Sequence, residues 1–319
     1  MTCRKWLVAA SAAVIMITII TLGLVADVSA ADKYEVIYNI PGLAGGAGPL
    51  GGLISDAAGN LYGTASFQGD ASFGGNGVVF KLSHDTSGGW RGTVLHTFQG
   101  TDGANPNGGL IFDRAGNLYG TTYSGGTHNN GTVFKLSPDP DGKWTETVLH
   151  IFQGSPDGAN PDAGLIFDRA GNLYGTSFNG GVLSFGGNGT VFELSLEPNG
   201  EWSETVLHIF QTTGPPNFQA TGGSGPQARL TFDRAGNLYG TTFSGGSPNG
   251  GVVFKLSPEP NGRWIETVLH GFQGFPDGAQ PIGDLVIDAA GNLYGTTTAG
   301  GNSGNCFIGG CGTVFRITP

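Results

Sequence analysis

The stretch GNLYGT at residues 59–64 decides the fold, because the same six residues return four more times along the chain. The later copies begin at Gly116, Gly171, Gly236 and Gly291, at spacings of 57, 55, 65 and 55 residues. A period of this length predicts a repeat architecture, in which each unit buries its apolar face against the next unit.

Each unit divides into four short apolar runs separated by turn residues. In the second unit the runs are GLIFD, LYGTT, GTVFKLS and TETVLHIFQ, with RAGN, a Gly-rich loop and PDPDGKW between them. Short runs rich in β-branched and aromatic residues, bounded by Gly, Asn and Asp, are typical of strands joined by hairpins. Four antiparallel strands in each of five units predict an all-β fold, a five-bladed β-propeller.

The two ends of the chain are expected to complete one blade together. The last unit stops at Pro319 after its third run, GTVFRITP, and the segment KYEVIYNI at residues 33–40 precedes the first unit. Ile40 aligns with Phe152, and the connection that follows then matches without a gap. We therefore expect residues 33–40 to pair as the fourth strand of the last blade and to close the ring, which removes an exposed sheet edge.

The N-terminal segment has the order of a secretory leader. Arg4 and Lys5 precede an uncharged, mostly apolar run from Trp6 to Ala26, and Val28-Ser29-Ala30 follows. This order predicts a signal peptide cleaved near Ala30 and a secreted or periplasmic protein. An uncleaved anchor is the alternative, because an apolar run of about 20 residues can cross a bilayer.

The expected domain organisation is a signal peptide over residues 1–30 and one propeller over residues 31–319. The repeats are expected at residues 50–98, 107–152, 162–210, 228–272 and 283–319.

Charge excludes several classes of partner. Without Arg4, Lys5 and Asp27 the formal net charge changes from −10 to −11. An acidic chain without basic clusters is a poor partner for nucleic acid or an anionic lipid surface. We expect a monomer with no nucleic-acid partner and no membrane insertion after cleavage of the leader.

Two cysteines remain after cleavage, Cys306 and Cys311, around the loop NCFIGGC. In an exported protein a close pair of this kind predicts a disulfide. A metal site is the weaker alternative, because no His lies nearby and two thiolates do not complete a zinc shell.

Residues that recur once per blade are expected to have structural roles. An Asp ends each first strand, where its side chain can accept hydrogen bonds from turn amides. A His occupies one position of the fourth strand in four blades, with Tyr38 in that slot of the closing strand. The histidines are His96, His150, His208 and His270. Because they lie on different blades, too far apart to share one ion, we expect packing or hydrogen bonding, no metal and no cofactor.

With GNLYGTT, a Gly-Gly loop and GTVFKLSP recurring in that order over residues 33–319, the chain resembles the GloVer tandem repeats of bacterial "choice-of-anchor" exported proteins. The resemblance implies an exported protein with a repeat of this period and no established enzymatic activity. Members of that family often end in a sorting or anchoring segment. Because nothing follows Pro319 in this sequence, we expect a freely secreted or periplasmic form instead of an anchored one.

Departures from the repeat are where a ligand site is expected. Connections between blades and between second and third strands emerge on one face, here called the loop face. The DRAGN and PDPDGKW turns emerge on the opposite face, here called the turn face. Loops on the loop face are longer and more variable, and binding sites favour such loops on a rigid scaffold.

The first loop-face candidates lie near the mouth of the central channel. The connection at residues 212–228 is expanded and contains Phe218. Arg229 and Asp284 replace glycine at the start of the innermost strands, where they form a salt bridge or contact a polar ligand. Asp162 is the nearest further carboxylate.

Aromatic loop tips are the remaining candidates, at Phe73, Phe185 and Phe307. Their side chains either tuck onto the hub of the propeller or form platforms for a sugar ring or a peptide.

The leading functional hypothesis is an exported, non-enzymatic module that binds carbohydrate or another envelope or extracellular component through the loop face, with several weak contacts raising avidity. One alternative, by analogy of fold, is a glycoside-active enzyme at the central channel. Such chemistry needs two carboxylates roughly 5 to 10 Å apart, and Asp162 and Asp284 are the unrepeated candidates. The other alternative is a purely structural or protein-interaction module of the envelope.

Overall fold

The computed structural model describes residues 34–40, 46–67, 75–181, 188–211, 222–301 and 311–318. The chain divides into two units, Met1–Ile37 and Tyr38–Pro319, and the sheets belong to the second. Among the described residues, no helix has the length and apolar character that crossing a membrane requires. The apolar run at residues 6–26 lies outside the described residues.

The described part of the chain forms 19 strands in five antiparallel sheets. The first blade comprises β1 (Ile54–Ser55), β2 (Leu61–Ala65), β3 (Val78–His84) and β4 (Trp90–Thr97). The second comprises β5 (Ile111–Phe112), β6 (Leu118–Thr122), β7 (Thr132–Pro138) and β8 (Trp144–Ile151). The third comprises β9 (Ile166–Phe167), β10 (Leu173–Ser177), β11 (Thr190–Leu196) and β12 (Trp202–Ile209). The fourth comprises β13 (Thr231–Phe232), β14 (Leu238–Thr242), β15 (Val252–Pro258) and β16 (Trp264–Gly271). The fifth comprises β17 (Val286–Ile287), β18 (Leu293–Thr297) and β19 (Thr313–Ile317).

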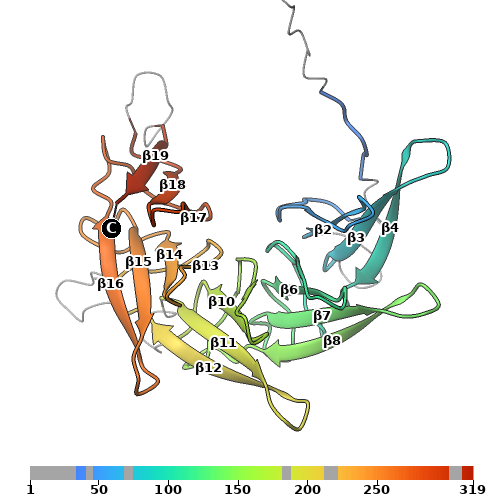
Figure 1. Cartoon of the computed structure of the whole chain (residues 1–319), viewed down its shortest axis with the longest axis horizontal. Helices are drawn as coiled ribbons and strands as arrows, with labels where there is room; N and C mark the ends of the chain where they lie inside the picture. Colours follow the sequence, from blue (N-terminus) through green and yellow to red (C-terminus); the bar gives the residue numbers. More distant parts are fainter. Residues whose placement is uncertain are drawn as a thin grey trace, which may run out of the picture. The chain divides into compact units, whose positions relative to one another are not determined.

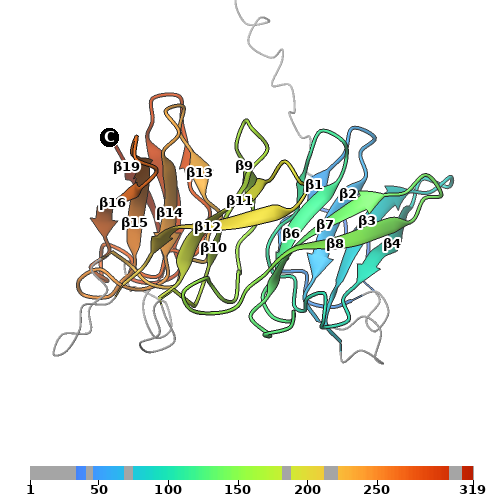
Figure 2. The ribbon, with the colours of Figure 1, turned by 90° about the horizontal axis from the view of Figure 1, so that it is seen from below.

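Within Tyr38–Pro319 the sheets follow one another in chain order around a common centre (Figure 1). In each blade the shortest strand is innermost and the strands pair in sequence order, so every connection within a blade is a hairpin. Seen from the side, the strands of a blade run antiparallel between the two faces (Figure 2). The predicted five-bladed β-propeller is confirmed.

The repeated turn is held by the Asp that precedes it. Asp56 Oδ1 accepts hydrogen bonds from the backbone N–H groups of Ala58 and Asn60, both at 2.9 Å. Asp56 Oδ2 accepts from the Asn60 side chain at 2.7 Å and from the Tyr62 hydroxyl at 3.0 Å. The same aspartate–tyrosine bond recurs in the other four blades. The predicted structural role of these aspartates is confirmed.

Both glycines of GNLYGT are required, Gly59 by its backbone conformation and Gly63 by the side chains around it. Gly59 adopts φ +80°, which side chains disfavour. A Cβ on Gly63 would stand 2.7 Å from Leu53 Cδ2 and 2.9 Å from Phe80 Cζ. A side chain at position 63 would therefore collide with Leu53, just before the innermost strand, and with Phe80 of the third strand.

Aromatic contacts join each blade to the next. Tyr62 packs edge-to-face on Phe112 and Trp144 of the second blade, with ring centroids 5.1 and 6.2 Å apart. Phe98 packs on Phe134 of that blade at 5.1 Å. Equivalent phenylalanine pairs recur at the next three interfaces. Such pairs contribute about 0.5–1.5 kcal/mol each beyond area burial, so the sequence repeat gives these four interfaces the same stabilising contact.

The structure differs from the sequence expectation at the closing strand. Residues 34–40 carry no strand, and the fifth blade is a three-stranded sheet, β17-β18-β19. The expected pairing joins opposite ends of the chain, the most non-local contact of the fold, whereas the contacts that form are local. Tyr38 and Ile40 pack against the Phe80 and Leu82 cluster of the first blade.

The side chains that contact between the fifth and first blades would cover are exposed. Val314 of β19 is 82 % exposed, whereas the four equivalent valines of the other blades are fully buried. Leu53 of the first blade is 51 % exposed, whereas its counterpart Leu110 is fully buried. These two apolar surfaces are what the interface between the fifth and first blades would bury.

Candidate functional site

Five of the predicted site residues lie outside the described residues. They are Phe73, Phe185, Phe218, Cys306 and Phe307. The aromatic loop tips, the insertion and the disulfide between Cys306 and Cys311 therefore stay predictions.

Asp162 lies in a polar row that crosses three blades at the start of the innermost strands. The Asn107 side-chain amide donates to Asp162 Oδ1 at 2.8 Å, and the Gln227 amide donates to Oδ2 at 3.2 Å. Each of the three residues follows the proline of its own blade, where the first and fifth blades have Leu50 and Ile282. Both carboxylate oxygens of Asp162 therefore accept hydrogen bonds, one from a residue of each neighbouring blade.

Arg229 and Asp284 form the salt bridge that the sequence offered as one of two alternatives. Arg229 Nη2 lies 3.0 Å from Asp284 Oδ2, and the Arg229 backbone N–H donates to Oδ1 at 2.8 Å. The side chains are 41 % and 48 % exposed, so the pair contributes little to stability. The two contacts link the fourth blade to the fifth.

Each fourth-strand histidine lies near a carboxylate. His96, His150 and His270 form the predicted hydrogen bond, whereas His208 Nε2 has no hydrogen-bond partner among the described residues. The Nε2 atoms lie 3.0 Å from Asp102 for His96, 3.2 Å from Asp157 for His150, 3.4 Å from Glu266 for His208 and 2.9 Å from Asp277 for His270.

At the first two interfaces between blades, a glutamate of the following blade lies near the histidine–aspartate pair. The glutamates are Glu146 and Glu204. Burial raises the pKa of Glu146 to about 7, with His96 opposing the shift and Asp102 adding to it. Burial also raises the pKa of Glu204, and the adjacent Asp157 adds to that shift.

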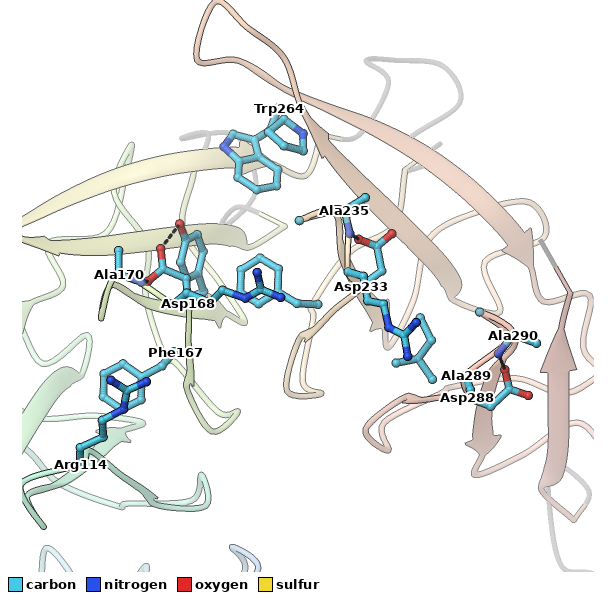
Figure 3. Close-up of a pocket in the computed structure, with 18 residues that line it drawn as sticks. Arg114, Phe167, Asp168, Ala170, Asp233, Ala235, Trp264, Asp288, Ala289 and Ala290 are labelled. Carbon is cyan, nitrogen blue, oxygen red and sulfur yellow. Dashed lines mark hydrogen bonds between the residues drawn. The ribbon is translucent and has the colours of Figure 1, made fainter.

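A cavity of about 1260 Å³ lies on the turn face, among the first turns of the second to fifth blades (Figure 3). Small-molecule sites usually measure about 300–1,000 Å³, so this cavity suits an extended ligand. Its aromatic wall consists of Phe167, Tyr174, Phe232 and Trp264.

Three arginines line this cavity from one repeated position. Arg114, Arg169 and Arg234 each follow the turn Asp of the second, third and fourth blades, where the first and fifth blades have Ala57 and Ala289. All three are exposed, and no ion pair engages them within the described ranges.

The arginines and the aromatic rings come from different blades. In Figure 3 Arg114, on the second blade, and Phe167, on the third, are both drawn among the residues that line the cavity. The cavity therefore combines guanidinium groups with aromatic surface.

The carboxylates of the cavity are occupied by their own turns. Asp168 Oδ1 accepts backbone hydrogen bonds from Ala170, Gly171 and Asn172, each at 2.8 Å. The Asn292 side chain holds the pKa of Asp288 below its ordinary value. These carboxylates therefore have few lone pairs left for proton transfer, whereas the arginine donors are available.

The geometry favours recognition of a carboxylate or sulfate group. A guanidinium presents paired N–H donors that match such an anion, and the aromatic wall offers apolar faces to a ring. A ligand that combines repeated anionic groups with flat ring faces would use both features at once.

The three arginines were not predicted from the sequence, because the predictions placed the ligand on the loop face. A comparison of the turns would have found them: DRAGN occurs in three blades, whereas the first and fifth carry DAAGN. That the arginines meet at one cavity needed the ring arrangement of the blades.

Comparison with known families gives one match: the Gloeobacter/Verrucomicrobia repeat matches residues 21–219 and 210–319. No curated protein matches the chain.

Solved structures with similar folds include a secretion-system component, an endo-arabinanase and a protein of unknown function. PorZ, a surface component of the type-IX secretion system of Porphyromonas gingivalis, is 14 % identical, with 84 % of this chain and 32 % of PorZ covered and a TM-score of 0.46. The chain thus spans 32 % of the length of PorZ. A GH43 endo-arabinanase from Bacillus licheniformis is 14 % identical, with 88 % and 95 % covered and a TM-score of 0.42. A protein of unknown function from Dyadobacter fermentans is 12 % identical, with 86 % and 82 % covered and a TM-score of 0.47.

Proposed function

This chain belongs to the Gloeobacter/Verrucomicrobia repeat family, and we propose that it is an exported, non-enzymatic propeller that binds an acidic carbohydrate of the envelope or its surroundings in the turn-face cavity. The observation that carries the proposal is the set of three exposed arginines, Arg114, Arg169 and Arg234, in a cavity that aromatic rings also line.

Ligand chemistry follows from the donors and from the size of the cavity. Three guanidinium groups on successive blades suit a polymer with an anionic group on successive sugars, such as a uronic acid or a sulfated sugar. Each contact on an exposed surface is weak, and several contacts on one polymer raise avidity. The overall negative charge of the protein disfavours unspecific binding of polyanions, so the arginines act locally.

Two arguments support a role in binding without catalysis. The cavity's aspartates accept hydrogen bonds from their own turns. At the opposite channel mouth, Asp162 is bracketed by two amides and Asp284 is paired with Arg229. A glycosidase needs one carboxyl group free to protonate the leaving group and a second to act as base or nucleophile.

Export is part of the proposal and rests on the leader sequence at residues 1–30. The loop-face site predicted from sequence, at Phe73, Phe185 and Phe307, is kept as a competing location for the same ligand. A protein partner in the envelope is the other outcome that the test below separates.

A glycan array with neutral, uronic and sulfated glycans tests the proposal. The purified 31–319 protein is compared with a variant in which Arg114, Arg169 and Arg234 are changed to Ala. This variant turns DRAGN into DAAGN, which the first and fifth blades already use, so the fold is expected to survive. We expect wild-type binding to acidic glycans and loss of that binding in the variant.

Two further variants locate the site. Changing Arg91, Lys143 and Arg263 to Ala removes the same number of exposed positive charges from turn-face residues that do not line the cavity, and should leave binding intact. Changing Phe73, Phe185 and Phe307 to Ala tests the loop face. Binding lost only in the phenylalanine variant would move the site to the loop face. No glycan binding by folded wild type would overturn the proposal and favour a protein partner.

A further inference from the structure

The interface between the second and third blades brings three metal-ligating side chains together. His150 lies on β8, Asp157 in the connection that follows, and Glu204 on β12 of the next blade. One potential ligand atom from each residue lies within 4.8 Å of the others. In the part of the chain that the structure describes, no other group of three such side chains is this close.

The cluster is shielded from solvent and incompletely bonded. The His150 and Asp157 side chains are 15 % and 12 % exposed. Glu204 Oε1 is buried and has no hydrogen-bond partner among the described residues, as is also true of Glu146 Oε1 and Glu266 Oε1 at the neighbouring interfaces. A buried carboxyl oxygen without a partner is costly, because it has lost its hydration and gained nothing in return.

His150 and Asp157 already stand at the separation that a shared ion requires. His150 Nε2 lies 3.3 Å from Asp157 Oδ1 and 3.2 Å from Oδ2. Ligand atoms bonded to one tetrahedral zinc at about 2.0–2.2 Å stand roughly 3.3–3.6 Å apart. A Glu204 oxygen lies within 4.8 Å of both atoms and would have to approach them to complete three such contacts.

The other interfaces of the same chain lack this arrangement. The first interface has the same residue types, His96, Asp102 and Glu146, but its connection is one residue shorter and the three do not come within 4.8 Å. The third interface has Gly222 in place of the Asp. At the closing position, Tyr38 and Gly92 stand where the others have His and Glu.

We propose that His150, Asp157 and Glu204 form a binding site for one divalent transition-metal ion, with zinc the best fit, that clamps the second blade to the third. One imidazole nitrogen and two carboxylate oxygens are a donor set that zinc accepts in four-coordinate geometry, with a water at the fourth position. Oxygen-only ions such as Mg²⁺ fit poorly, because a nitrogen donor is central to the cluster. The ion would have a structural role, since the cluster lies between blades and away from the turn-face cavity.

The four fourth-strand histidines lie on different blades and do not share one ion. The cluster needs only one of them, because its other donors come from the following connection and the neighbouring blade.

Titration of metal-free, tag-free 31–319 protein with Zn²⁺ or Co²⁺ tests this inference. We expect one tight zinc equivalent by calorimetry and a visible Co²⁺ spectrum typical of four-coordination. Glu204→Gln should weaken zinc binding by about tenfold or more and remove that spectrum. Glu146→Gln, the matched change at the first interface, should leave both unchanged.

A second variant keeps the test decisive if Glu204→Gln fails to fold. His150→Tyr with Glu204→Gly reproduces the residues of the closing interface, Tyr38 and Gly92, and should also abolish the tight zinc equivalent. Zinc binding that persists in this variant, or is lost equally in Glu146→Gln, would overturn the inference. Absence of a tight equivalent in wild type would do the same.

Discussion

Tyr38 places its phenol oxygen where a side chain on Gly92 would have to stand. Three other blades carry glutamate at the position of Gly92, and four carry histidine at the position of Tyr38. The two replacements occur together at one interface, so the segment before the first blade occupies the slot of a preceding blade's fourth strand. This relationship supports the expected register of the closing segment although no strand forms there.

Gly92→Glu tests the close contact between Tyr38 and position 92. The new side chain would overlap Tyr38, and we expect a loss of about 2 kcal/mol in the free energy of unfolding, measured by urea denaturation. Adding Tyr38→His restores the histidine–glutamate pair of the other interfaces and should recover at least half of that loss. Strictly additive effects of the two changes would contradict the contact.

Ile40→Ala should destabilise the propeller by about 1–2 kcal/mol, because Ile40 packs on the first blade in the place that Phe98 occupies on the second. Val36→Ala is the matched control: Val36 is 56 % exposed, so we expect a change within about 0.5 kcal/mol. Equal effects in thermal unfolding would argue against a role for Ile40 in the first blade.

Tyr119→Phe tests the turn network. The Tyr119 hydroxyl donates to Asp113 Oδ2 at 3.1 Å, and the tyrosine is only 4 % exposed. We expect a loss of about 1 kcal/mol in unfolding free energy. Asp113→Ala removes the acceptor for the whole turn and should cost more, about 2–3 kcal/mol. The order of the two variants in denaturant midpoint is the measurement, and a reversed order would contradict the network.

Glu146 should make stability depend on pH. Its pKa is raised to about 7 in the folded protein, chiefly by burial, against an ordinary value of 4.5. The folded state therefore holds a proton more tightly, so this contribution is complete below pH 4.5 and is lost as pH rises through 7.

Glu146→Gln should flatten that decline. The carboxyl is partly exposed, so solvent screening reduces the effect. We expect the difference in unfolding free energy between wild type and variant to change by about 1 kcal/mol between pH 5 and 8. Unfolding free energies at four pH values in chelator-treated buffer measure it. Parallel curves for the two proteins would contradict the raised pKa.

The repeat made the architecture predictable because each blade uses the same local chemistry. Asp56, Gly59 and Tyr62 act within one hairpin, and their roles follow from sequence spacing alone. The number of blades follows from the number of copies.

Contacts between blades were less predictable. Arg114 and Phe167 line the same cavity although 53 positions separate them, and His150 and Glu204 lie close together across 54 positions. Such contacts depend on the rotation from one blade to the next and on the length of each connection, which residue patterns within a blade do not encode.

The role of Arg114, Arg169 and Arg234 is tested most directly by calorimetric titration with an oligogalacturonate and its methyl ester. The account predicts binding of the acid form and binding at least about tenfold weaker for the ester, since charged hydrogen bonds to the arginines contribute about 1.5–3 kcal/mol each. Changing the three arginines to Ala should weaken binding of the acid form equally, whereas the Arg91, Lys143 and Arg263 control should bind like wild type. Equal affinity of wild type and the arginine variant for the acid form would contradict the account.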